Sequence, residues 1–299
     1  MKLFSPVYYK KFACIADKCS HSCCVGWEIS VDGETLAKYE RDGREDILKQ
    51  VSSDGDFAEI VLLDDGRCPF LDECGLCRII SECGDSYTSR ICREHPRFYH
   101  RIGDVCEVGL GAVCEEAARL MLSESDFSSL VELPEYFDEA ADETDFDTLS
   151  YRAEIFDMLL RRGLTYTEKI RGIAERFDVS ARLSEDFYEA LAELELLEEE
   201  NRELFILGDA ECPIAAQRFA ERFLAYLVFR HVSVAENYEN LRARVGFCLL
   251  LLGIFENSAA KIPELTLDAA ADIARRISSE IEYSEDNTAA LIFEFESSI

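Results

Sequence analysis

The chain of 299 residues lacks the features of an exported or membrane-spanning protein. Its first segment, MKLFSPVYYKKFAC, has no apolar h-region and no small-residue cleavage site, so we expect a cytoplasmic protein. The longest apolar run, VGFCLLLLGIF at residues 245–255, is about half of what spans a bilayer. This run predicts a buried helix and no membrane partner.

Basic residues are also scarce, with 31 Lys and Arg against 61 Asp and Glu and a formal net charge of −30. Nucleic acid is therefore excluded as a partner, because phosphate binding needs a basic surface. A positively charged partner, such as a lysine-bearing protein, would be attracted at long range. The alternative is that the acidity only keeps the protein soluble.

Cysteine, in contrast, is abundant: the chain has thirteen, and only Cys212 and Cys248 lie beyond residue 115. An odd number of cysteines, no export signal and a chain long enough to bury a real core all argue against a secreted disulfide scaffold. The sequence therefore predicts a local metal site with thiolate ligands.

Three regions follow one another along the chain. Residues 1–125 hold most of the turn-forming Gly and Pro, with short strand candidates at 27–31, 59–63 and 105–108 and one exposed helix or two short ones at 34–51. Residues 126–149 are acidic and predict a linker. Apolar residues at helical spacing fill the remainder, in stretches at 151–162, 166–177, 182–201, 214–231, 238–255, 267–281 and 288–295.

The predicted fold class is thus mainly α. A small, loop-rich α+β cysteine module, residues 1–125, would bind a metal that adds the stability its small core lacks. A helical bundle, residues 150–299, would follow the linker. No repeat of 20–50 residues is evident.

The cysteine spacing supports a metal site. Gaps of two to four residues, as in Cys14-x4-Cys19-x3-Cys23-Cys24 and Cys74-x2-Cys77, let thiolates converge on one ion or cluster. Only one pair has the form of a zinc knuckle, the ferredoxin spacing is absent, and one zinc needs fewer thiols. We therefore favour a [4Fe–4S] cluster, with zinc as the alternative.

Other residues near these cysteines have simpler interpretations. We interpret His21 as a loop residue or a hydrogen-bond donor to a cluster sulfur, and His95 with Arg97 as positive charge near an anionic cluster. The segment VCEVGLGAV at residues 105–113 has two of the three glycines of a nucleotide or S-adenosylmethionine loop, and we predict a hairpin turn instead. Small buried hydrophobes are predicted at Cys83, Cys106, Cys212 and Cys248.

Taken together, residues 8–122 resemble the flagellin lysine-N-methylases (FliB type), and the cysteine module is similar to the wider CxxCxxCC group of zinc- or iron-chelating proteins. The motifs are Phe12-x-Cys14-x4-Cys19-x3-Cys23-Cys24-x-Gly26-Trp27, Cys68-Pro-Phe-Leu, Leu76-Cys77, Cys92-x3-Pro96-Arg97 and Cys114-x2-Ala117-Ala118-Arg119-Leu120. Beyond residue 122 the resemblance is weaker and rests on an aromatic helix at residues 218–231.

The resemblance implies transfer of a methyl group from S-adenosylmethionine to surface lysines of flagellin or of another basic protein surface, with a [4Fe–4S] cluster taking part. It places the family's cysteines at Cys14, Cys19, Cys23, Cys24, Cys68, Cys77, Cys92 and Cys114. A carboxylate or tyrosine base is expected, and its position is not implied. Two alternatives stay open: a non-enzymatic zinc- or iron-binding module, and an adaptor with a structural metal site.

Overall fold

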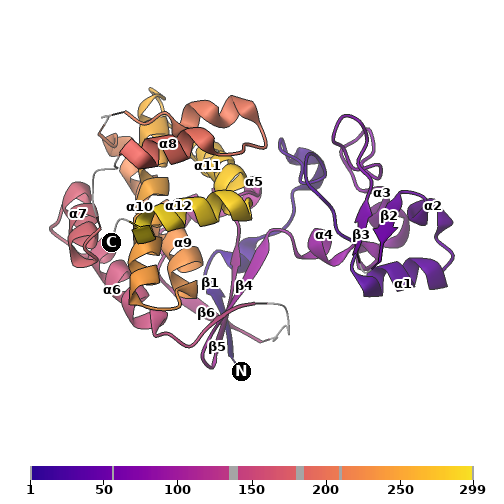
Figure 1. The fold of residues 1–299 in the computed structure, drawn as a ribbon, viewed down its shortest axis with the longest axis horizontal. Helices are drawn as coiled ribbons and strands as arrows, with labels where there is room; N and C mark the ends of the chain where they lie inside the picture. Colours follow the sequence, from indigo (N-terminus) through magenta and orange to yellow (C-terminus); the bar gives the residue numbers. More distant parts are fainter. Residues whose placement is uncertain (1, 56, 135–140, 180–184, 209–210, 298–299) are drawn as a thin grey trace. The chain divides into compact units, whose positions relative to one another are not determined.

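The computed structural model describes residues 2–55, 57–134, 141–179, 185–208 and 211–297. The chain forms two compact units (Figure 1). The first, which we call the cysteine unit, is Ala13–Arg97, and the second, the helical unit, combines Met1–Phe12 with Phe98–Ile299. Each unit is described by itself.

The helical unit contains a five-stranded sheet in the order β6-β1-β5-β4-β7. Its strands are β1 (Lys2–Pro6), β4 (Arg97–Ile102), β5 (Val105–Leu110), β6 (Leu130–Leu133) and β7 (Asp142–Thr144). The sheet is mixed, since β1 runs parallel to β5 and antiparallel to β6, and β4 runs parallel to β7. The central strand β5 is buried from Cys106 onward, as expected for a strand with neighbours on both edges.

Helices make up the remainder of this unit and lie on one side of the sheet in Figure 1. They are α5 (Glu115–Ser123), α6 (Thr148–Leu160), α7 (Tyr166–Arg176), α8 (Glu185–Glu193), α9 (Ile214–His231), α10 (Tyr238–Ala260), α11 (Leu267–Ile277) and α12 (Glu285–Ser297), with a π-helical turn at Ser278–Glu282. Side-chain caps begin several of them, including a full capping box of Thr165 with Glu168 at α7.

The core of the helical unit forms around α9 and α10, which are buried on nearly every side. By length and composition α10 could span a membrane, but most of its apolar segment is buried within the unit, in contact with α9 and α12. Gly246 makes the close approach of α12 possible, because a Cβ there would lie 2.4 Å from the Phe295 ring. The apolar run at residues 245–255 is therefore a buried helix, as predicted.

The cysteine unit has short elements and a small core. Its helices are α1 (Gly33–Arg41), α2 (Glu45–Leu48), α3 (Arg78–Cys83) and α4 (Arg90–Glu94), and β2 (Val51–Asp54) pairs antiparallel with β3 (Phe57–Ile60). Its buried apolar residues include Tyr39, Ile47 and Phe70. Of the two alternatives predicted for 34–51, one exposed helix or two short ones, the structure has the two short helices. Each buries one side chain completely, Tyr39 in α1 and Ile47 in α2.

The structure divides the chain at other places than the sequence analysis does. Residues 1–12 and 98–125, assigned to the cysteine module, belong to the helical unit, where they form strands and α5. The predicted linker contains β6 and β7, which complete the edges of the sheet, and its residues 135–140 lie outside the described part. Sheet pairing between distant segments leaves no local pattern in the sequence, which explains the difference.

The helical character of the C-terminal region is confirmed. The predicted helix at 214–231 coincides with α9, and α6, α7, α10, α11 and α12 overlap their predicted ranges. Where one helix was predicted at 182–201, the structure has two shorter elements, α8 and a 3₁₀ helix at Glu199–Phe205. Residues 182–184 lie outside the described part. Of the strand candidates, 105–108 lies in β5 and 59–63 overlaps β3, whereas 27–31 forms only a bridge between Ser30 and Glu59.

Candidate metal centre

Backbone pairing in the cysteine unit brings two cysteine segments together. The N–H of Cys68 donates to the carbonyl of Cys24 at 2.8 Å, and the N–H of Gly26 donates to the carbonyl of Gly66 at 2.8 Å. Val25 and Arg67 form an antiparallel bridge between these two bonds. The Cys24 and Cys68 backbones are therefore held side by side by main-chain hydrogen bonds.

A tight turn adds a third segment. The carboxylate of Asp72 accepts hydrogen bonds from the N–H groups of Cys74 and Leu76, both at 2.8 Å. Gly75 has φ +78°, which suits glycine in such a turn. Leu71 and Cys77 then form a bridge that folds Cys77 back toward the Cys68 segment.

The short helix α4 carries Cys92, and Asp32 positions it. One carboxylate oxygen of Asp32 accepts from the N–H of Thr35 at 2.9 Å and caps α1, while the other accepts from the N–H of Arg90 at 2.7 Å. Burial raises the pKa of Asp32, but these two backbone hydrogen bonds outweigh it and the pKa is lowered. One side chain thus joins the starts of α1 and α4.

Electrostatic interactions connect several of the thiols. A hydrogen bond with Cys24, burial and the charges of Cys24, Cys14 and Cys92 raise the pKa of Cys23. The same hydrogen bond lowers the pKa of Cys24. Cys68 and Cys77 are connected to these thiols as well. The pKa of Cys68 is raised to about 12, mainly by burial, and the charges of Cys24, Cys92 and Cys77 contribute to the rise.

Interactions of this kind connect six of the eight predicted ligands, each with at least one other member: Cys14, Cys23, Cys24, Cys68, Cys77 and Cys92. We call them the thiol group. Cys19 lies in the same loop, where its thiol donates to the carbonyl of His21 at 3.3 Å. Cys114 differs, because it belongs to the helical unit and stands at the N-cap of α5.

The thiol group fits a thiophilic metal in its chemistry. All thirteen cysteines are free of disulfides, and thiolates are the ligands that zinc and iron–sulfur clusters prefer. Within the described residues, however, no three His, Cys, Asp or Glu side chains are arranged to hold a metal ion. The structure thus brings candidate donors into one region without showing a coordination geometry.

Three expectations for neighbouring residues change. Burial, followed by the charge of Arg97, lowers the pKa of His95 to about 4, so His95 is neutral at pH 7 and adds no positive charge. Cys83 is half-buried against the guanidinium of Arg44, and Cys212 is half-buried and interacts with Glu256, so neither is a plain buried hydrophobe. The predicted burial of Cys106 and Cys248 is confirmed.

The predicted hairpin at residues 105–113 is also wrong. Strand β5 continues through a turn into α5, which is the strand–turn–helix order of a nucleotide loop. Side chains fill this turn, however: a Cβ on Gly109 would lie 2.2 Å from the Phe98 ring, and one on Gly111 would lie 2.2 Å from the Tyr283 hydroxyl. The glycines make room for the protein's own aromatic residues and not for a ligand.

A buried polar network behind this turn was not predicted. The hydroxyl of Tyr226 donates to the carboxylate of Glu282 at 3.0 Å and accepts from the N–H of Ala112 and from Arg230, both at 3.0 Å. Nε2 of His231 lies 2.7 Å from the same carboxylate. Burial raises the pKa of Glu282, but Arg230 and the hydrogen bond with His231 hold it at about 2, so the group is ionised.

A second ion pair lies nearby in the same unit. The guanidinium of Arg152 binds both carboxylate oxygens of Glu107 at 2.6 Å, and both side chains are buried. The sequence signal for these networks is slight. Polar residues such as Tyr226 and Arg230, four residues apart on an apolar helix, are the only local sign of them.

Comparison with known proteins gives three similar chains. The flagellar biosynthetic protein FliU of Salmonella muenchen is 30% identical over 136 residues, which is 42% of this chain and 80% of FliU. Lysine-N-methylases of Salmonella typhimurium and Salmonella choleraesuis are each 29% identical over 136 residues, again 42% of this chain but only 34% of the methylase. No protein-family model and no solved structure matches the chain.

Proposed function

Because the chain belongs to the family of FliU and the lysine-N-methylases, we propose that it is a protein-lysine N-methyltransferase that uses S-adenosylmethionine and acts on surface lysines of flagellin. The observation that carries the proposal is the match of 30% identity that spans 80% of FliU, together with the lysine-N-methylases that match at 29%. The alignment covers about a third of each methylase, so the activity of those proteins comes to this chain as part of the proposal.

The thiol group supports the proposed [4Fe–4S] cluster. Its six cysteines offer more donors than the four that one cluster needs, and their mutual repulsion as thiolates would be relieved by a bound cation. A bound cluster would supply an electron-poor iron to which the amino and carboxylate groups of S-adenosylmethionine bind. The protein's own part is to hold the donor segments together through the Cys24–Cys68 backbone pairing and the Asp32 cap.

The proposed reaction is a direct methyl transfer. The lysine ammonium group first loses a proton to a base of the protein, and the lone pair of the resulting neutral amine then attacks the methyl carbon of the sulfonium. The N–C bond forms as the S–C bond breaks, and the bonding electrons stay on sulfur, which leaves S-adenosylhomocysteine. The products are N-methyl-lysine and one released proton.

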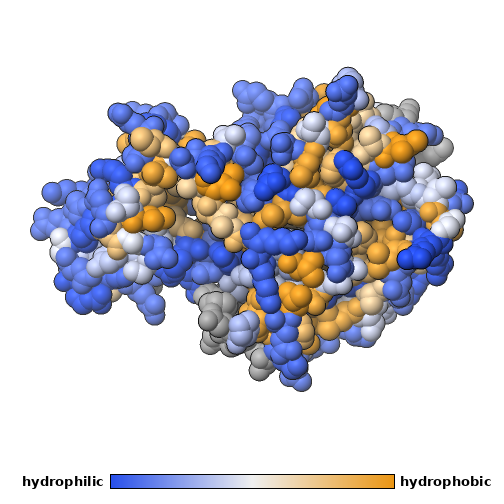
Figure 2. Space-filling view, turned by 180° about the vertical axis from the view of Figure 1, so that it is seen from behind, coloured by the Kyte–Doolittle hydropathy of each residue, from blue (hydrophilic) through white to orange (hydrophobic). Residues whose placement is uncertain are grey.

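The charge of the chain fits a lysine-bearing partner. With a formal net charge of −30, the protein attracts basic surfaces at long range, and hydrophilic side chains cover most of the face shown in Figure 2. Such steering weakens as the ionic strength rises. We propose that the protein meets its substrate in the cytoplasm.

The direct test incubates iron-reconstituted protein with flagellin and methyl-labelled S-adenosylmethionine, followed by amino-acid analysis of the flagellin. Label in N-methyl-lysine is the expected result. The matched control is the Cys24→Ser, Cys68→Ser double variant, which keeps the fold of the helical unit and lacks two donors. If the reconstituted wild-type protein leaves no label in the lysines of flagellin, the lysine assignment is disproved.

Metal analysis of the same samples separates the proposal from a non-enzymatic zinc module. About four irons per chain, with visible thiolate-to-iron absorbance, are expected. One zinc per chain, a colourless protein and no methylation would instead identify the structural alternative.

A further inference from the structure

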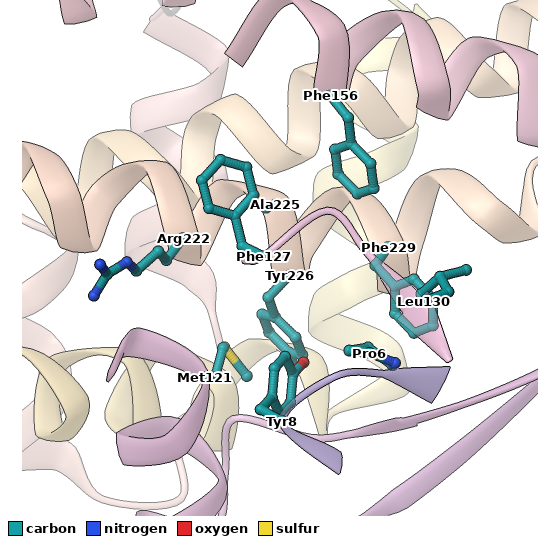
Figure 3. A pocket seen from close by; sticks show the side chains of 10 residues that line it. All are labelled: Pro6, Tyr8, Met121, Phe127, Leu130, Phe156, Arg222, Ala225, Tyr226 and Phe229. Carbon is teal, nitrogen blue, oxygen red and sulfur yellow. The ribbon is translucent and has the colours of Figure 1, made fainter. Parts of the chain in front are cut away.

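The helical unit contains a small pocket in which five of the ten lining residues are aromatic (Figure 3). Tyr8, Phe127, Phe156, Tyr226 and Phe229 contribute their rings to it. These residues come from the chain start, the segment after α5, helix α6 and helix α9. The pocket has room for about one water molecule, which is the size of an ammonium or methyl group and far smaller than a nucleoside.

Two of the five rings already serve the internal networks. The hydroxyl of Tyr226 is engaged with Glu282, Arg230 and the N–H of Ala112. The guanidinium of Arg152 lies 5.0 Å from the centre of the Phe229 ring. These contacts fix two walls of the pocket.

The other three rings are not used in this way. Among the described residues, Tyr8, Phe127 and Phe156 pair with no other ring and with no cation. A ring face carries partial negative charge and attracts a cation that comes within about 6 Å of its centre. The pocket therefore presents vacant aromatic faces to whatever enters it.

Tyr8 adds an unpartnered polar atom. Its side chain is only 4% exposed, and within the described part of the chain its hydroxyl has no hydrogen-bond partner. Burial and the negative charge of Glu282 raise the pKa of Tyr8, so the hydroxyl stays protonated and lies in the field of that carboxylate. A hydroxyl without a protein partner can accept a hydrogen bond from a ligand, and an N–H donor with a positive charge is its best match here.

The pocket's own cation is directed elsewhere. Arg222 lines the pocket with its side-chain stem, but its guanidinium donates to the carbonyl of Leu122 at 2.5 Å. Figure 3 shows this group pointing away from the rings. Positive charge from the protein therefore does not fill the aromatic site.

We propose that this pocket receives the terminal ammonium group of a substrate lysine, with Tyr8 as hydrogen-bond acceptor and Phe127 and Phe156 as cation–π partners. The proposal rests on the lysine methylation proposed above and names where a lysine of the substrate protein other than the one that is methylated is recognised, because the pocket excludes the methyl donor. Phe127 and Leu130 are half-buried and line the pocket, so the proposal places the entry of the slim lysine chain beside them. A sulfonium with three bulky substituents does not fit such a space.

Calorimetric titration of the full-length protein tests this without S-adenosylmethionine or metal. The probes are a short peptide with a central lysine and the same peptide with norleucine, which has the chain without the amine. The lysine peptide should bind at least about tenfold more tightly. Tyr8→Phe should weaken lysine binding about tenfold, and Phe156→Leu about fivefold.

Phe219→Leu is the matched control, because Phe219 is equally buried on α9 but does not line the pocket. It should leave the affinity unchanged, and thermal unfolding of each variant checks the fold. Equal binding of both peptides, or wild-type affinity in both pocket variants, overturns the proposal, as does selective binding of trimethylsulfonium. Since this assay needs no turnover, its failure is distinct from a failure of methylation.

Discussion

The backbone N–H of Cys68 donates a 2.8 Å hydrogen bond to the carbonyl oxygen of Cys24. This bond joins two cysteine segments that are far apart in the sequence, and the charge of Cys24 contributes to the raised pKa of Cys68. The candidate metal centre is thus organised by main-chain pairing as well as by the spacing of its cysteines.

Replacing members of the thiol group should remove the metal. We expect Cys24→Ser and Cys92→Ser to lose most bound metal after reconstitution, because a serine hydroxyl is a poor ligand for zinc or iron. Cys19 is also a predicted ligand, and Cys19→Ser tests in the same way whether it binds the metal. Metal content is read by elemental analysis and visible absorbance.

Cys74→Ser is the control for these variants. Cys74 is exposed in the same unit but is not part of the thiol group. It should retain its metal. Unchanged metal in both Cys24→Ser and Cys92→Ser would contradict the ligand assignment.

Asp32→Asn should loosen the cysteine unit. The change weakens the cap of α1 and the hydrogen bond that holds α4, at a cost of about 1–2 kcal/mol in the free energy of unfolding. Urea unfolding followed by fluorescence of the single tryptophan, Trp27, measures this unit selectively. Glu34→Gln, next in the first turn of α1, is the control, and an equal loss in both variants would exclude a special role for Asp32.

Glu282 should make stability depend on acid pH. Its pKa is about 2 in the folded protein and near 4.5 when unfolded, so its contribution is complete above about pH 4.5 and disappears as the pH falls toward 2. The expected loss is about 3 kcal/mol. Unfolding of wild type and Glu282→Gln between pH 6 and 2 measures it.

The Glu282→Gln variant should be less stable at pH 6 by about 3–5 kcal/mol, because Arg230 is left as a buried unpaired charge. Its stability should also change less between pH 4.5 and 2. Parallel pH profiles for the two proteins would show that Glu282 is not ionised in the fold.

Two glycines of α10 should respond in opposite directions to alanine. Gly246→Ala places a Cβ against the Phe295 ring and should destabilise the protein by about 1–3 kcal/mol. Gly253→Ala meets nothing within 4 Å and should stabilise it by about 0.5–1 kcal/mol, since alanine favours the helix. Thermal unfolding decides, and equal effects would disprove the close α10–α12 contact.

The sequence by itself determined the features that depend on local pattern. Helical spacing of apolar residues located α9 and its neighbours, and the run at residues 245–255 identified a core helix, because burial of one face follows directly from the order of side chains. The cysteine spacing pointed to the residues that form the thiol group, and the motifs pointed to the family.

Only the tertiary structure decided what depends on contacts between distant segments. The five-stranded sheet recruits residues 2–6 and 142–144, the Glu282 network joins α9 to the π-helical turn, and the aromatic pocket combines Tyr8 with Phe156. Contacts between distant segments also place Cys114 in the helical unit, apart from the cysteines of the thiol group. Strand partners and buried ion pairs are chosen by packing in three dimensions, and that choice leaves no spacing in the sequence.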